Sequence, residues 1–219
     1  MERFALVAAT VAAVLAVVSG AQAKIPPNGV DLCGVSACVQ LGFAEAEEIW
    51  ISGHDYGRPL RVPSPFYVVR YRWYSSGPEQ IGYYVPAGPA VRLPTENGGL
   101  GTWMWLDRAT ASAIDRAVAA VPPHPVRRPS TVMVGEKRAL GPETYLRLLP
   151  GRADGLITPA TIWITVTMRS NPATPWTDGA SDIRLSARGR SRLVLVDGWV
   201  HKVPLRIANR ARRGLPLVP

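Results

Sequence analysis

Alternation of apolar and polar residues over 66–74 gives the clearest local prediction in the chain. The positions that share one side of this extended segment are all apolar or aromatic: Tyr67, Val69, Tyr71 and Trp73. Arg70 and Arg72 fall on the other side, together with Val68 and Tyr74. A period of two is typical of a strand with one packed and one wetter face. Further strands are predicted over 81–85, 90–93, 102–106, 131–134, 161–168 and 183–187.

A hairpin is predicted near the C-terminus. Asp197-Gly198 separates two apolar runs, residues 192–196 and 199–202. Asp-Gly between such runs is typical of a two-residue type I′ turn, in which both turn residues adopt positive φ.

Helical spacing begins after Asp107, a residue type that caps helix N-termini well. Apolar residues follow at intervals of three and four and predict a helix over 108–121: Ala111, Ile114, Val118 and Val121. A short helix is also predicted over 142–149, with Pro142 in its first turn. Residues 44–51 fit either a helix or the end of a strand.

The order of these elements is strands, a helix, then strands. This order favours an α+β fold, mainly antiparallel β with one or two short helices packed on the sheet, over a doubly wound fold. We predict an N-terminal arm over 24–65, with a cysteine loop and a Pro-rich segment, and a globular domain over 66–219.

The first 23 residues are typical of a cleavable signal peptide. Arg3 precedes a 15-residue apolar run, and Ala21-Gln22-Ala23 forms a small-x-small cleavage site. The run is short for a bilayer-spanning helix, which needs about 20 residues, although a retained anchor is the alternative. Cleavage would leave 196 residues from Lys24, with no later segment of membrane-spanning length. The protein is therefore expected to be secreted or extracytoplasmic.

Only two cysteines are present, Cys33 and Cys38. Exported thiols usually oxidise, so we expect these two residues to form a disulfide. A metal site would need further ligands at suitable spacing, and none lies nearby in the sequence.

Motifs for catalysis are missing from the sequence: no H-E-x-x-H, G-x-S-x-G, Walker loop or dinucleotide fingerprint occurs. Ser36 lies in a near match to the nucleophile elbow, but Cys38 replaces its last glycine. The three histidines are His54, His124 and His201, and their spacing matches no zinc-ligand pattern. We therefore expect no catalytic residue, metal or cofactor.

Two weaker candidates concern sugar chemistry. A pair of carboxylates could serve a glycosidase if the fold brought two of them together: Glu45, Glu47, Glu48, Glu136, Asp154, Asp178 and Asp182. Trp103 and Trp105 share a strand face and could stack on a sugar, although we expect both to be core residues.

The uneven distribution of charge along the chain is the one sequence feature that points to a partner. Residues 184–213 hold nine basic residues and one acid, Asp197, for a net charge of +8 within a chain total of +9. The candidate anion-binding residues are all arginines in this segment: Arg188, Arg190, Arg192, Arg206, Arg210 and Arg213. The expected partners are anionic lipid headgroups, wall polymer or acidic polysaccharide, since an extracytoplasmic location argues against nucleic acid.

The sequence thus favours an exported or envelope-associated, non-catalytic protein that binds an anionic envelope component. The alternatives are a secreted hydrolase with a carboxylate or His54 site, and a protein-binding module that uses a Pro-ordered loop. A further alternative is that the basic surface is only solvated and binds no partner.

Overall fold

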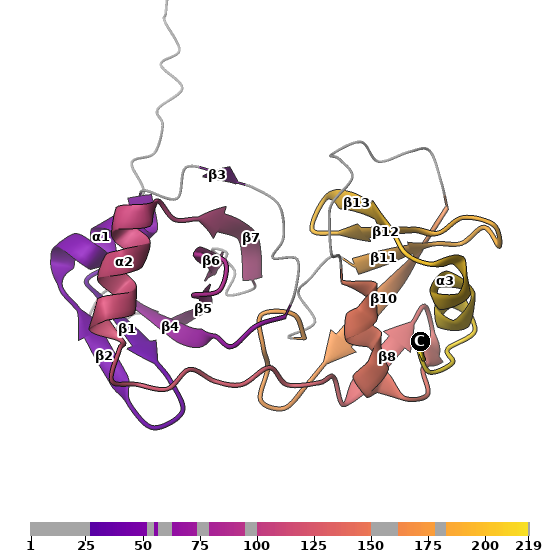
Figure 1. The fold of residues 1–219 in the computed structure, drawn as a ribbon, viewed down its shortest axis with the longest axis horizontal. Helices are drawn as coiled ribbons and strands as arrows, with labels where there is room; N and C mark the ends of the chain where they lie inside the picture. The colour runs from indigo at the N-terminus through magenta and orange to yellow at the C-terminus, as the bar shows by residue number, and fades with distance from the viewer. Residues whose placement is uncertain are drawn as a thin grey trace, which may run out of the picture.

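Two antiparallel β-sheets form most of the structure (Figure 1). The computed structural model describes residues 27–51, 55–56, 63–73, 79–94, 100–149, 162–177 and 183–218. Within these residues the mainly antiparallel α+β fold class is confirmed, with three α-helices and one 3-10 helix rather than one or two helices. The predicted leader, residues 1–23, lies outside the described residues.

The first sheet has the strand order β2-β1-β4-β5-β6-β7-β3. Its strands are β1 (Gly29–Cys33), β2 (Cys38–Leu41), β3 (Asp55–Tyr56), β4 (Tyr67–Arg72), β5 (Gln80–Val85), β6 (Ala90–Pro94) and β7 (Leu100–Trp105). Strands β1 and β2 lie within the segment predicted as an N-terminal arm, and β1 pairs directly with β4.

The second sheet has the strand order β13-β12-β11-β10-β8-β9. Its strands are β8 (Thr131–Val134), β9 (Lys137–Arg138), β10 (Trp163–Arg169), β11 (Ile183–Ser186), β12 (Leu193–Val196) and β13 (Trp199–Lys202). Asp197 and Gly198 join β12 to β13 with φ of 46° and 85°, which confirms the predicted positive-φ turn.

The helices are α1 (Phe43–Ile51), α2 (Arg108–Ala117), the 3-10 helix η1 (Pro142–Leu148) and α3 (Leu205–Arg212). Asp107 caps α2 as predicted, with Oδ1 accepting hydrogen bonds from the backbone amides of Ala109 and Thr110. The helix ends at Ala117, earlier than predicted, although Val118 and Val121 still enter the core. The ambiguous segment is helical, because Ala46 and Ile49, three residues apart, are buried on one face.

Two hydrophobic clusters cover opposite faces of the first sheet. On one face, Tyr67, Val69 and Tyr71 of β4 pack with side chains of α1 and α2, as their alternation predicts. On the other face, Tyr83 and Trp103 join a cluster that also contains core residues of the second sheet. The two sheets therefore share one hydrophobic core.

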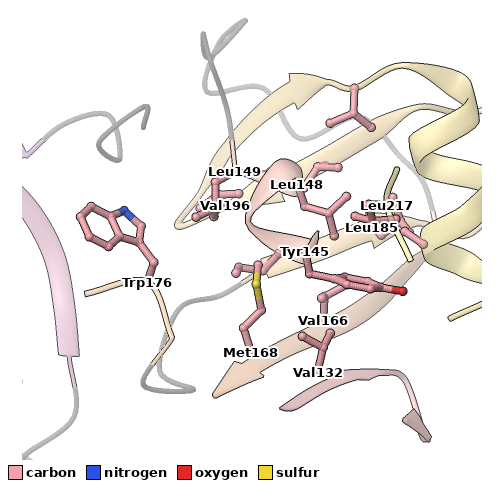
Figure 2. Close-up of a cluster of buried hydrophobic side chains, with 14 of the residues drawn as sticks. Val132, Tyr145, Leu148, Leu149, Val166, Met168, Trp176, Leu185, Val196 and Leu217 are labelled. Carbon is pink, nitrogen blue, oxygen red and sulfur yellow. The ribbon is translucent and has the colours of Figure 1, made fainter. Parts of the chain in front are cut away.

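Figure 2 shows part of this shared cluster, where Val166, Met168 and Leu185 of the second sheet surround Tyr145 of η1. The indole of Trp176 stands apart from them, on the loop over 171–177. Its ring centroid lies 5.9 Å from that of Trp103 and 6.3 Å from that of Phe66. Aromatic packing thus connects the two halves of the molecule.

Arg92 connects the same halves through polar contacts. Its side chain is 1% exposed, and its guanidinium donates to the carbonyls of Gly101 and Pro175. It also forms an ion pair of 3.2 Å with Asp197 in the β12–β13 turn, and lies 5.5 Å from the centre of the Trp103 ring. A charge so deeply buried is tolerated because each of these groups compensates for lost hydration.

The predicted disulfide is present: Cys33 is bonded to Cys38, and the pair joins β1 to β2. The turn between them lies against the end of the α2 region, where the amide of Val35 donates to the carbonyl of Pro122 at 2.9 Å. A side chain at Gly34 would place Cβ 2.2 Å from that carbonyl oxygen, so this close approach requires glycine.

Candidate anion-binding surface

The basic segment folds into three pieces that lie close together. The first is the loop over 187–192 between β11 and β12, which we call the arginine loop and which carries Arg188, Arg190 and Arg192. The second is the end of β13, with Lys202, and the third is α3 with its C-cap residue Arg213. The side chains of Arg188, Arg190, Arg192, Arg206 and Arg213 are all exposed, and we call these five residues the basic surface.

Arg212 joins the arginine loop to α3. Its guanidinium donates to the carbonyl oxygens of Ser186 (2.7 Å) and Gly189 (3.2 Å), and also to that of Ser191. The same group donates to Asn209 Oδ1, one turn back on the helix. Burial lowers the pKa of Arg212, but a guanidinium titrates so far above neutral pH that it remains charged. One arginine thus binds the backbone of the loop, while the side chains of Arg188, Arg190 and Arg192 are exposed to solvent.

The arginine loop is also tied to the start of α3. The amide of Val203 donates to the carbonyl of Arg192 at 2.9 Å, and Leu193 is paired with Lys202 across β12 and β13. These contacts place Lys202 and Arg206 near the end of the loop. Residues that are up to 25 positions apart in sequence therefore form one basic region.

Two of the predicted residues on α3 are engaged by the protein itself. Arg210 is half-buried, and its Nε donates to the carbonyl of Pro216 in the C-terminal segment. Arg213 is exposed, and its Nε donates to the carbonyl of Asn209 at 3.3 Å. Arg210 is therefore less available to a ligand than Arg206 or Arg213.

Acidic side chains form no ion pair with the basic surface within the described residues. Asp197, the single acid of the segment, is paired with Arg92 on the side of the first sheet. Residues 124–219 contain 16 basic and 6 acidic residues, a net charge of +10. Residues 24–123 contain 8 basic and 9 acidic residues, a net charge of −1. The positive potential is therefore concentrated on the second half.

The remaining candidates are placed elsewhere or fall outside the described residues. His54 lies outside them, as do Asp154, Asp178 and Asp182. His124 stacks on Phe66 with ring centroids 5.5 Å apart, and burial, followed by the charge of Arg127, lowers its pKa. His201 is 2% exposed, and its Nε2 is hydrogen-bonded to the carbonyl of Leu148.

The tryptophans proposed as a sugar platform are core residues. Trp103 is buried and Trp105 is half-buried against the shared cluster, as the core interpretation predicts. Within the described residues, no group of three or more His, Cys, Asp or Glu side chains has the arrangement of a metal site. The helices among these residues are too short or too polar to cross a membrane.

Sequence reasoning identified the arginines but missed two features around them. Arg212 was counted among the basic residues, but nothing in its spacing distinguished it from Arg210 or Arg213. The contacts between α3 and the arginine loop depend on the tertiary fold. No protein-family model matches this chain, and the searches find no curated protein and no solved structure similar to it.

Proposed function

We propose that this protein is exported and binds an anionic component of the cell envelope, without catalysis, through the basic surface. The observation that carries the proposal is the set of five exposed arginines, gathered by Arg212 and lacking acidic partners among the described residues. Planar guanidinium groups bind phosphate and carboxylate oxygens in pairs of parallel hydrogen bonds. A cluster of them suits a surface or polymer that carries repeated negative charge.

Export is supported by the leader over 1–23 and by the disulfide between Cys33 and Cys38. Structural disulfides persist in oxidising compartments and are rare in the cytosol. The anionic groups that an exported protein meets are lipid headgroups, wall polymers and acidic polysaccharides. These are the proposed ligand classes.

Co-sedimentation of the mature protein with anionic vesicles, neutral vesicles and isolated wall material tests the proposal. Binding to an anionic surface should weaken as salt is raised, because exposed charges are screened over about 8 Å at physiological ionic strength. The test variant is Arg188→Gln with Arg190→Gln, which removes two charges from the arginine loop. For vesicles, about 1 kcal/mol per arginine predicts binding about 30-fold weaker.

The matched control is Arg108→Gln with Arg116→Gln, which removes two exposed charges from α2 in the other half. Glutamine is used because it is nearly as good a helix former as arginine. The control should bind within about twofold of the parent. If the parent binds no anionic material in a salt-sensitive way, or both variants lose affinity equally, the basic surface does not have this function.

A further inference from the structure

Exposed aliphatic side chains lie near the basic surface, at the start of the arginine loop and after the end of α3. The amide of Ala187 donates to the carbonyl of Ile162 at 2.7 Å, which places Ile162 next to the start of the arginine loop. The amide of Leu140 donates to the carbonyl of Gly214 at 2.8 Å, next to Arg213. Ile162 is 67% exposed and Leu140 is 64% exposed.

A third aliphatic residue, Leu205, begins α3 and is 42% exposed. Leu205 and Arg212 are seven residues apart, so they share one side of the helix, the side that contacts the arginine loop. Arg206 and Arg213, also seven apart, form the neighbouring solvent-facing row. Figure 1 shows α3 at the outer edge of the second half, away from the first sheet. The helix is therefore accessible to a large partner.

Single exposed aliphatic residues are common on soluble proteins and carry no meaning alone. Here they lie near arginines that lack acidic partners among the described residues. A charged polymer would bind the guanidinium groups and leave Ile162 and Leu140 in water. A bilayer surface offers phosphate groups for the arginines and an apolar boundary just beneath for the aliphatic side chains.

We propose that the anionic component is the surface of a lipid bilayer, and that Ile162, Leu140 and Leu205 enter its interfacial region while the arginines contact headgroup phosphates. This inference rests on the proposed function and narrows its ligand. Insertion is shallow, because Ile207, Ala208 and Ala211 of α3 are committed to the protein core. The side chains that enter the lipid therefore protrude from the flanking segments and from the first helical residue.

The first test uses a double variant that carries both Leu140→Ser and Ile162→Ser. Its binding to anionic vesicles is compared with that of the parent. The combined variant should bind about tenfold more weakly, and the part of binding that survives high salt should disappear. Its affinity for soluble inorganic polyphosphate should equal that of the parent, because the arginines are intact. The matched control, Phe43→Ser with Ile81→Ser, removes exposed apolar side chains from the first half and should bind vesicles as the parent does.

The second test reports insertion directly. Both native cysteines are disulfide-bonded, so Ile162→Cys provides a single thiol for an environment-sensitive fluorophore. Anionic vesicles should shift its emission to the blue, whereas the same label at Phe43→Cys, 64% exposed in the first half, should not respond.

The outcomes separate the two proposals. If the parent binds polyphosphate or wall material but not vesicles, or if the aliphatic variant binds vesicles as the parent does, the bilayer inference fails and the proposed function stands. If the parent binds none of these anions, the proposed function fails as well. Unchanged emission at Ile162 on vesicles that do bind the protein would also overturn the inference.

Discussion

Replacing Arg92 with methionine should destabilise the protein far more than replacing an arginine on its surface. Methionine has a similar length and adapts to irregular space, so the change removes the charge and the donors with little loss of volume. The variant would leave three buried or partly buried acceptors without their arginine: the carbonyls of Gly101 and Pro175 and the carboxylate of Asp197.

The expected loss follows from burial. Each buried acceptor without a donor costs about 1–3 kcal/mol, and breaking a buried ion pair by removing one partner costs about 3–5 kcal/mol. These costs overlap, so we expect a total loss of about 3–5 kcal/mol. Natural domains have a total stability of about 5–15 kcal/mol. Arg92→Met should therefore remove a large part of the stability that holds the two halves together.

Urea denaturation followed by tryptophan fluorescence measures the effect, since Trp103 and Trp176 lie beside Arg92 and its partner Pro175. The control is Arg70→Met, because Arg70 and its partner Glu79 are both exposed and 3.8 Å apart. An exposed pair contributes about 0–1 kcal/mol, so this control should unfold almost as the parent does.

A double-mutant cycle isolates the ion pair. Asp197→Asn is the second change, because asparagine tolerates the positive φ of this turn better than most residues. The Arg92→Met chain should lose less stability when Asp197 is also changed, with a coupling energy of about 1–3 kcal/mol. A loss for Arg92→Met no larger than that of Arg70→Met, or a coupling energy near zero, would refute the reasoning.

Four further predictions concern separate parts of the chain. Gly198→Val should lower stability by more than about 1 kcal/mol in urea denaturation, because a β-branched residue resists the φ of 85° found there; an unchanged midpoint would contradict this. Thiol labelling of denatured, unreduced protein should find no free Cys33 or Cys38, and two labelled thiols per chain would overturn the assignment. Because burial lowers the pKa of His124, the unfolded chain binds its proton first as pH falls below about 6.5. The free energy of unfolding should therefore fall from pH 7 to pH 5 more in the parent than in His124→Gln. Equal losses in the two proteins would argue against this role of His124. Exported protein should begin at Lys24 by N-terminal sequencing; a mature form that keeps the leader would mean an anchor.

Local patterns in the sequence were sufficient for the features that depend on neighbouring residues. The alternation around Tyr67 predicts a strand with a packed face, and Asp197-Gly198 predicts a turn with positive φ. Asp107 predicts a helix start because its side chain reaches amides only two and three residues ahead. Cys33 and Cys38 are the only pair available, so their bonding needed no knowledge of the fold. The sequence also located the positive charge, since a charge run is visible without any structure.

Only the tertiary structure decided how distant residues come together. Arg92 follows the same alternation as Arg70, yet one is buried and the other exposed, because the second half covers that part of the first sheet. The role of Trp176 depends likewise on a loop that meets Trp103 across 73 positions. Arg212 binds the arginine loop because the packing of α3 directs its side chain there. Contacts of this kind depend on how whole sheets and helices pack against one another. The periodicity of the sequence does not encode that packing.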